Sequence, residues 1–460
     1  MDVVIHEPLA WAELNFASAS LGDSRRTRRL VKSAARIAAH PEKSFTQIFD
    51  WNELRAFYLL CNQEQANLAA VMGPHWELTR QAMREQALVL VLHDTTELDF
   101  SSHTKLQGAG QIGNENGRGF LQHNSLAILP EPRQVLGLAY QQLRTRQPAP
   151  VGESTYQRKR RPRESDLWIE GFRASGRPPE RCCWVDVADR GSDDYEAMRA
   201  ATEVGHDFLF RVSQNRVVFT TEAHDQQSYL LDYARSLPSL GADTVEIPGR
   251  GGRPARSASV CMTAAAVWVP APAGTSQRSS QPVISAWVIR IWEPAPPPGE
   301  EAVEWILLSS LATRTLDDLR TRRDWYCCRW MVEIFHNIEK NGCSEEDRRF
   351  EKAERMETCL AILSIVAVRV FQLRCALEHQ PTAPADQVGT QTEIQVIQRY
   401  TKHKGKGFMV RDFVRGVARL GGFLGRKGDG EPGVRALWRG YQRLQDMLEG
   451  IQLISAINSG

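Results

Sequence analysis

The sequence predicts an α/β protein with a mixed sheet, flanking helices, a β-rich subdomain and helical domains at both ends. Short apolar runs typical of buried strands alternate with helical segments between residues 87 and 212. Residues 241–300 have a different sequence pattern, in which strand-like runs are separated by Gly, Ser and Pro. We therefore predict a helical domain at 1–72, an α/β domain at 73–375 containing the β-rich insertion, and a helical domain at 376–460.

The individual elements follow from the spacing of apolar residues and from turn residues. A run of apolar residues ends at His93-Asp94, and a second ends at Asp189. Asp23 or Ser24 can cap a basic helix near the N-terminus. Strands are predicted at 87–92, 123–130, 135–140, 182–188, 208–212, 258–269, 283–292 and 304–310, and helices at 167–174 and 357–378.

Composition narrows the class of protein. The apolar fraction of 42% and the charged fraction of 24% are ordinary for a globular protein. The nine cysteines form no C-x-x-C pair, which argues against a zinc site and for a reduced protein. The N-terminus has no signal segment, and the longest apolar run, Cys359–Val368, is shorter than a membrane span. We expect a cytoplasmic protein without a membrane partner.

Lysine and arginine are concentrated in three blocks, although the net charge is only +2. The first block contains Arg25, Arg26, Arg28 and Arg29, the second is R-K-R-R-P-R at 158–163, and the third lies between 402 and 443. Separated basic blocks in a near-neutral chain predict several contacts to a polyanion such as DNA. The alternative is that these blocks are solvated surface.

Three acids are placed as metal ligands would be. Asp94 and Asp189 follow predicted strands, and Glu333 lies on a predicted helix. Carboxylates at strand ends converge at a sheet edge, and oxygen ligands of this kind suit Mg²⁺. The alternative for each aspartate is a turn or helix cap. Other acids near these positions fit the pattern less well: Glu97, Asp99, Asp186, Asp193, Asp194 and Glu339.

The segment around Glu333 has an unusual polar pattern. On an ideal helix with about 100° per residue, four residues of Y-C-C-R-W-M-V-E-I-F-H-N-I-E-K fall within one narrow arc. A salt-bridged surface would explain this stripe equally well. The four residues are Tyr326, Arg329, Glu333 and Lys340.

These four positions match the signature Y-(2)-R-(3)-E-(6)-K, and the chain resembles bacterial DDE insertion-sequence transposases of the branch with that signature, the insertion-sequence-four family. The resemblance extends to L-H-D-T-T at Asp94, A-D-R at Asp189 and S-L-G-D-S-R-R-T-R-R-L near the N-terminus. It also includes E-W-I-L-L-S-S and S-I-V-A-V-R-V-F-Q-L-R, and covers residues 12–375.

The resemblance implies an RNase H-like catalytic domain with a β-rich insertion between the second aspartate and the glutamate. It implies cut-and-paste transposition, in which a synaptic homodimer binds terminal inverted repeats in double-stranded DNA and cleaves them, commonly through a hairpin. The freed 3′-hydroxyls then attack target DNA. Two Mg²⁺ ions, replaceable by Mn²⁺, would be held by Asp94, Asp189 and Glu333. The setting would be a bacterial cytoplasm, at the nucleoid when DNA is bound.

Roles for further residues also follow from the resemblance. Tyr326, Arg329 and Lys340 would hold the terminal phosphates and strand, and Trp305 would support a flipped base. Trp330 borders the polar stripe and can stack on a base, although core packing explains both tryptophans as well. Weaker matches are Arg211 and His123, the latter equally explained as a structural residue.

The sequence leaves two other functions open. One is a catalytically inactive DNA-binding relative, such as a transposition inhibitor. The other is a different RNase H-like nuclease, such as a Holliday-junction resolvase, although the long gap between Asp189 and Glu333 argues against it. In the C-terminal helices, we expect two protomers to pair through four apolar residues: Leu437, Tyr441, Leu444 and Leu448.

Overall fold

The structure is a computed structural model. It divides into two compact units. Unit 1 contains residues 1–85, 95–155 and 331–460, and unit 2 contains residues 86–94 and 156–330. The residues that the structure describes are 8–40, 43–113, 116–146, 150, 152–154, 157, 161–247, 255–272, 283–405, 407–426 and 429–459. Of the predicted second basic block, residues 158–160 lie outside this set.

Unit 1 begins with a small helical domain. Asp23 caps its basic helix, because its side chain accepts a hydrogen bond from the Arg25 backbone at 2.8 Å. Leu30, Ala34 and Ile37 bury one face of that helix, so Arg25, Arg28 and Arg29 lie on its exposed side. The elements are α1 (Pro8–Phe16), α2 (Ser24–Ala39), α3 (Phe45–Ile48), α4 (Trp51–Cys61), η1 (Glu64–Ala66) and α5 (Leu68–Arg84).

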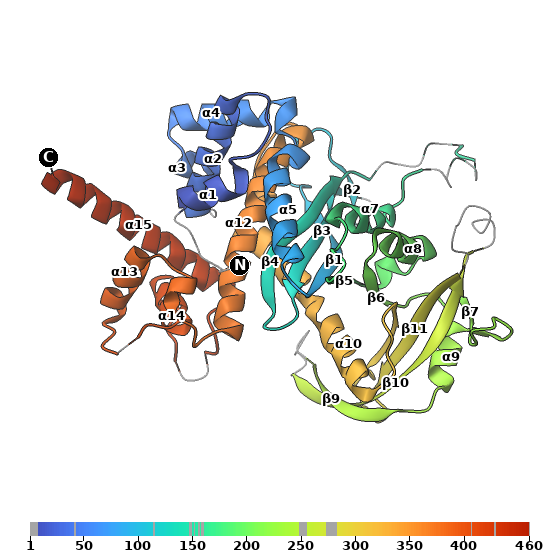
Figure 1. The fold of residues 1–460 in the computed structure, drawn as a ribbon. Coiled ribbons are helices and arrows are strands. Elements are labelled where there is room, and N and C mark those ends of the chain that lie inside the picture. The colour runs from blue at the N-terminus through green and yellow to red at the C-terminus, as the bar shows by residue number, and fades with distance from the viewer. Residues whose placement is uncertain are drawn as a thin grey trace. The chain divides into compact units, whose positions relative to one another are not determined.

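The sheet of unit 1 packs against α5 and the long helix α12 (Ala353–His379) (Figure 1). A side chain at Gly137 would lie 2.2 Å from the Thr79 hydroxyl, so only glycine allows this approach of strand and helix. His75 on α5 accepts a hydrogen bond from the Leu138 backbone, and burial lowers the pKa of His75 to about 3. The strands are β2 (Gly110–Ile112), β3 (Gly117–Leu129), β4 (Gln134–Arg144) and the distal part of β1 (Leu88–Asp99).

Helix α12 is long and apolar enough to cross a membrane by length and composition alone. However, 83% of its most apolar window is buried inside the protein. Burial of this extent is typical of the central helix of a globular core.

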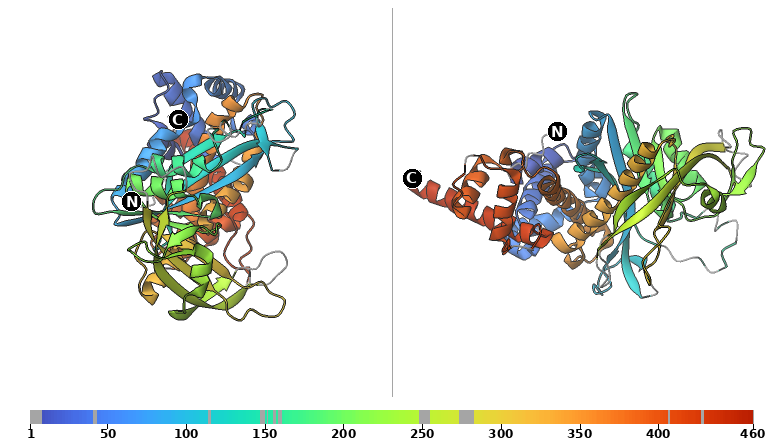
Figure 2. Two further views of the ribbon diagram at one scale, coloured as in Figure 1. Left: turned by 90° about the vertical axis from the view of Figure 1, so that its right-hand side faces the viewer. Right: turned by 90° about the horizontal axis from the view of Figure 1, so that it is seen from below.

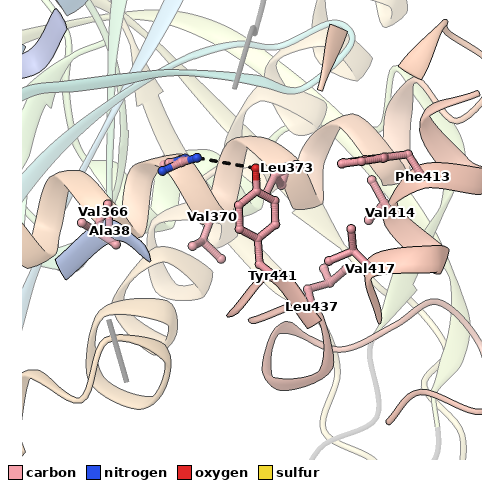
Figure 3. Close-up of a pocket in the computed structure, with 10 residues that line it drawn as sticks. Ala38, Val366, Val370, Leu373, Phe413, Val414, Val417, Leu437 and Tyr441 are labelled. Carbon is pink, nitrogen blue, oxygen red and sulfur yellow. Dashed lines mark hydrogen bonds between the residues drawn. The ribbon is translucent and has the colours of Figure 1, made fainter. Parts of the chain in front are cut away.

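The C-terminal helices of unit 1 form a core of their own with the end of α12. They are α13 (Gln391–Thr401), α14 (Val410–Leu420) and α15 (Val434–Ser459). Figure 3 shows Leu437 and Tyr441 of α15 facing Val370 and Leu373 of α12 across a small apolar pocket. The Tyr441 hydroxyl also donates to Glu393 at 3.0 Å.

These contacts correct the predicted pairing surface of α15. Leu437, Tyr441 and Leu444 are buried, and Leu448 packs against the same core, all within one protomer. The prediction was wrong because helical periodicity identifies an apolar face without identifying what covers it. Among the side chains of α15 that the structure describes, the large apolar ones that are exposed are Met447, Ile451, Ile454 and Ile457.

The sheet of unit 2 is mixed. The first part of β1 pairs in parallel with β5 (Cys183–Ala188), and β5 pairs in parallel with β6 (Asp207–Arg211). Strand β12 (Glu304–Ser309) pairs antiparallel to β6. Helices α7 (Asp166–Ser175) and α8 (Tyr195–Val204) pack against each other next to these strands. The strands predicted at 182–188, 208–212 and 304–310 are confirmed within a residue or two.

The described residues of the segment 241–300 form antiparallel strands that continue the same sheet beyond β12. Figure 2 shows the long, twisted strands β10 and β11 from two further directions. Its strands are β9 (Gly241–Ile247), β10 (Arg256–Pro270) and β11 (Val283–Trp292). The residues before it form β7 (Val217–Phe219), β8 (Gln227–Tyr229) and α9 (Leu230–Ser236).

The helix predicted through residues 326–340 is interrupted twice. Helix α10 (Leu316–Cys328) ends at Arg329, and α11 (Trp330–Asn337) passes into a π-helical turn at Ile338–Gly342. The assumption of one regular helix was therefore wrong. A π-turn has more residues per turn than an α-helix, so angles calculated for an ideal α-helix do not hold at Lys340.

Candidate functional site

The two predicted aspartates occupy matching positions on neighbouring strands of unit 2. His93 of β1 is the register partner of Ala188 of β5 in a parallel pair. Asp94 is the next residue of β1, which continues to Asp99, and Asp189 directly follows the last residue of β5, so the two aspartates lie where the pairing of β1 with β5 ends. The prediction that the first strand ends at Asp94 was therefore wrong, because the apolar run marks only the buried part of that strand. Neighbouring strands lie about 4.8 Å apart, and both aspartates are half-buried. This arrangement offers two carboxylates to one hard cation.

Asp94 has a cationic neighbour. The Arg329 guanidinium lies 3.3 Å from the Asp94 carboxylate, and both side chains are 15% exposed. A partly buried ion pair of this kind is less screened by salt than a surface pair. Arg329 thus supplies positive charge beside the first aspartate, which would attract an anionic phosphate.

Asp189 is held by a tight turn. Its carboxylate accepts a hydrogen bond from the Gly191 backbone at 2.8 Å, in the 3₁₀ turn η2 (Arg190–Ser192). A side chain at residue 191 would lie 2.7 Å from the Trp168 ring, so this close approach requires glycine. One oxygen of Asp189 thereby gains a fixed orientation.

A buried polar network lies on the other face of the same strands. The two carboxylate oxygens of Asp186 pair with His93 at 3.0 Å and with His206 at 2.9 Å, and all three side chains are buried. Burial raises the pKa of Asp186, but the charges and hydrogen bonds of His206 and His93 outweigh it and lower that pKa. Burial lowers the pKa of His206, yet Asp186 raises it overall. The network ties β1 to β5 directly behind the two aspartates.

The residues of unit 2 that are predicted to contact DNA differ in how exposed they are. Tyr326 is buried, with its ring centroid 5.7 Å from that of the half-buried Trp305. Trp330 is 46% exposed. Arg211 is half-buried, and its guanidinium lies 3.4 Å from the Glu304 carbonyl. Of these four residues, Trp330 presents the most surface to a ligand.

Glu333 and Lys340 belong to unit 1. Glu333 is half-buried on α11, and the Lys340 ammonium donates to the Glu97 carbonyl at 2.5 Å and lies 3.8 Å from Glu346. In the part of the chain that the structure describes, no three His, Cys, Asp or Glu side chains form a group that could hold a metal ion.

The competing acids are engaged in structural contacts. Asp194 caps α8, and Asp193 is buried against Arg216. Glu97 accepts a hydrogen bond from the Gly113 backbone. Asp99 is exposed, and Asp186 and Glu339 are fully buried. Similarly, His123 is buried with its Nδ1 2.9 Å from the Thr95 hydroxyl.

The basic helix α2 presents cations to solvent. Arg25, Arg28 and Arg29 are exposed. Arg26 differs, because its guanidinium donates to the Leu21 carbonyl and to Gln65. Arg26 is therefore a structural residue of the small domain in addition to any contact with a ligand.

A second cationic surface in unit 1 was not predicted. A groove between α4 and the loops near residues 103 and 350 is lined by several cations and a phenol ring. The R-R-F sequence at 348–350 was the available signal, but it lies outside the three basic blocks. The groove includes Tyr58, His103, Lys105, Arg349 and Arg355.

Two parts of the chain match models of known protein families. Residues 8–66 match the family described as transposase DNA-binding, and residues 387–459 match the family described as transposase Tn5 dimerisation domain. Both ends of the chain thus carry transposase domains. The first match contains α2 with its exposed arginines, and the second contains α13, α14 and α15. Together they support a Tn5-like, DNA-binding transposase that dimerises.

Proposed function

We propose that this protein is a cut-and-paste DNA transposase with an RNase H-like catalytic domain. It would bind the terminal inverted repeats of an element as a synaptic dimer, cleave them through a hairpin intermediate and join the 3′-hydroxyl ends to target DNA. The observation that carries the proposal is the pair Asp94 and Asp189, on neighbouring strands where the pairing of β1 with β5 ends, in a chain with two matches to transposase domains.

The DNA contacts are proposed from charge and exposure. Exposed arginines of α2 and the cations of the unit 1 groove suit a phosphate backbone, because neutralised phosphates release bound counterions. Arg329 and Lys340 would position phosphates near the cut, since cationic side chains orient anionic oxygens well. Trp330 is exposed enough to stack on a base. Trp305 and Tyr326 would act as a packed pair at the edge of that site.

The acids fit a divalent cation by their chemistry. Asp94 and Asp189 are half-buried, and Asp189 is oriented by the Gly191 backbone, as metal-binding carboxylates commonly are. We propose Glu333 as the third ligand of two Mg²⁺ ions, for which Mn²⁺ would substitute. When bound, such ions activate water and stabilise the leaving oxygen in phosphodiester cleavage. The protein would act in a bacterial cytoplasm, at the nucleoid.

A cleavage assay tests the proposal. Purified protein, Mg²⁺ and a labelled duplex copied from the DNA flanking the gene are combined for wild type and for Glu333→Ala. We expect wild type to cut the strand and yield a hairpin, while the variant binds without cutting. Binding without cleavage by wild type would favour the inactive DNA-binding alternative. Cleavage by both proteins would remove Glu333 from the site.

A further inference from the structure

The π-turn at Ile338–Gly342 carries two neighbouring charged residues with opposite surroundings. Lys340 is half-buried and donates to the Glu97 carbonyl. Glu339 is completely buried. π-Turns are rare and frequently occur at functional sites, because they shift the side chains that follow them. The conformation of this turn therefore determines where the Lys340 ammonium lies.

Glu339 joins this turn to three other elements of unit 1. Its Oε1 accepts a hydrogen bond from Gln122 of β3 at 2.7 Å and lies 3.3 Å from the Gln141 amide of β4. The same Gln141 amide donates to Ser364 of α12 at 2.9 Å. Among the described residues, the groups that hydrogen-bond to Glu339 are thus uncharged.

A second buried acid lies close by. Glu345 is fully buried, and the Ser364 hydroxyl lies 3.5 Å from its Oε1. Among the described atoms, Oε2 of Glu339 and Oε2 of Glu345 have no hydrogen-bond partner. A buried carboxylate needs its lone pairs satisfied to remain ionised, so this pattern favours protonated acids.

The surroundings of Glu339 and Glu345 also favour the protonated form of these acids. Burial raises the pKa of Glu339 to about 8, although Ser364, Gln122, Lys340 and Gln141 oppose the rise. Burial and then the neighbouring Glu339 raise the pKa of Glu345 well above its ordinary value, with Glu346 adding to this. Lys340 and Arg348 lower the pKa of Glu345 by less.

The helix α15 also packs against this turn, and two of its charged groups, Asp446 and Arg443, have partners elsewhere. Asp446 lies 3.7 Å from the Lys43 ammonium and 4.0 Å from His40, and Arg443 donates to the Leu420 carbonyl. Burial is the largest influence on the pKa values of both Glu339 and Glu345, and the neighbouring Glu339 is the next largest for Glu345.

We propose that Glu339, as a neutral carboxylic acid, is a positioning residue that anchors the π-turn and thereby places the Lys340 ammonium for DNA. The DNA part of this inference rests on the proposed function. The anchoring part concerns the folded chain alone, so the two parts have separate tests.

The first test compares Glu339→Gln with wild type in thermal unfolding of the full chain at pH 5 and at pH 8.5. The folded acid binds its proton more tightly than the unfolded acid, so its contribution to stability falls as pH rises from about 4.5 to about 8. Glutamine keeps the shape without titrating. We expect Tm values within about 1 °C at pH 5, and a Tm several degrees higher for the variant at pH 8.5.

An equal loss of stability at both pH values would show that an ionised Glu339 is required, which overturns the inference. A wild-type Tm that falls on adding EDTA, with no such fall in Glu339→Gln, would indicate a bound cation in place of the proton and would also overturn it. Hydrogen exchange of residues 335–343 supplies a readout local to the turn. It should rise in Glu339→Leu and stay near wild type in Glu339→Gln.

The second test measures binding of the labelled duplex against salt. Removing one cation that neutralises a phosphate reduces the slope of log affinity against log salt by about 1. We expect this reduction in Glu339→Leu and in Lys340→Ala, no further reduction in the double variant, and none in Glu339→Gln. An unchanged slope in Glu339→Leu would overturn the positioning role. If wild type binds no DNA, the proposed function fails, while the pH and exchange results still decide the anchoring.

Discussion

Two groups of acids in this chain differ in their surroundings although they share the same chemistry. Asp94 and Asp189 are half-buried where the pairing of β1 with β5 ends, beside the Arg329 guanidinium and the Gly191 backbone respectively. Glu339 and Glu345 are fully buried among amides and a hydroxyl. The first group keeps oxygen atoms within reach of solvent and cations, and the second does not. Surroundings therefore separate carboxylates suited to bind metal from acids suited to hold a turn.

The largest expected effect is on the proposed metal ligands. We expect Asp94→Asn, Asp189→Asn and Glu333→Gln each to reduce strand cleavage more than about 100-fold, because even outer-shell partners of metal ligands cost 10–100-fold when removed. Affinity for the DNA end should remain. Asp99→Asn is the matched control, since Asp99 is exposed and an amide can still accept from the Ser101 backbone. Full activity in any of the three variants would remove that acid from the site.

A smaller loss of cleavage activity is expected when Arg329, the cation beside Asp94, is replaced. Arg329→Gln should reduce cleavage by about 10- to 100-fold, as for other groups that support metal ligands. Arg329→Lys keeps the charge without the planar guanidinium, so its cleavage rate should lie between those of Arg329→Gln and wild type. Arg323→Gln, on α10 but paired with Asp243 and Asp324, controls for loss of charge alone. Equal cleavage by Arg329→Gln and Arg323→Gln would contradict a special role for Arg329.

DNA affinity should respond to salt through the exposed arginines. Replacing Arg25, Arg28 or Arg29 with glutamine should lower the slope of log affinity against log salt by about 1 for each phosphate that the protein no longer neutralises. Arg173→Gln on α7 of unit 2 provides a control outside the matched DNA-binding domain. Wild-type affinity that stays constant between low and moderate salt would show that these arginines do not bind phosphates.

The smallest effect is expected on the exposed face of α15. Ile451 and Ile454 are 44% and 60% exposed within the matched dimerisation domain. Figures 1 and 2 show the last turns of α15 extending beyond α13 and α14. Ile454→Lys should weaken dimers severalfold in sedimentation experiments, because it places a charge in an apolar contact. Leu424→Lys, which changes a 66% exposed loop residue, should leave the dimer affinity unchanged.

Truncation at Pro432 is a less informative way to test dimerisation. It removes Leu437, Tyr441 and Leu444, which are buried in the core of a single protomer. We therefore expect it to destabilise the C-terminal core as well as to prevent paired-end complexes. A truncated protein with unchanged thermal stability would contradict the packing of α15 seen in Figure 3.

The alternation of apolar runs and helical segments allowed most elements to be predicted. The strands at 182–188 and 208–212 were located closely because they are short, continuous apolar runs that are buried in the structure, and the helix at 167–174 was located as closely. The helix through 326–340 was not, because a π-turn leaves no distinctive pattern in the sequence. The burial of Glu339 was missed for a different reason, since a glutamate beside a lysine is typical of solvated surface.

By itself, the sequence determined the order of most elements, the position of Asp189 at a strand end and the basic helix, and it predicted a transposase from a resemblance. Only the tertiary structure decided that Arg329 pairs with Asp94, that Glu339 is buried with Gln122, and that part of the apolar face of α15 belongs to its own protomer. Local pattern depends on neighbours along the chain, which the sequence contains. Burial and pairing depend on residues far apart in sequence, and folding alone brings those together.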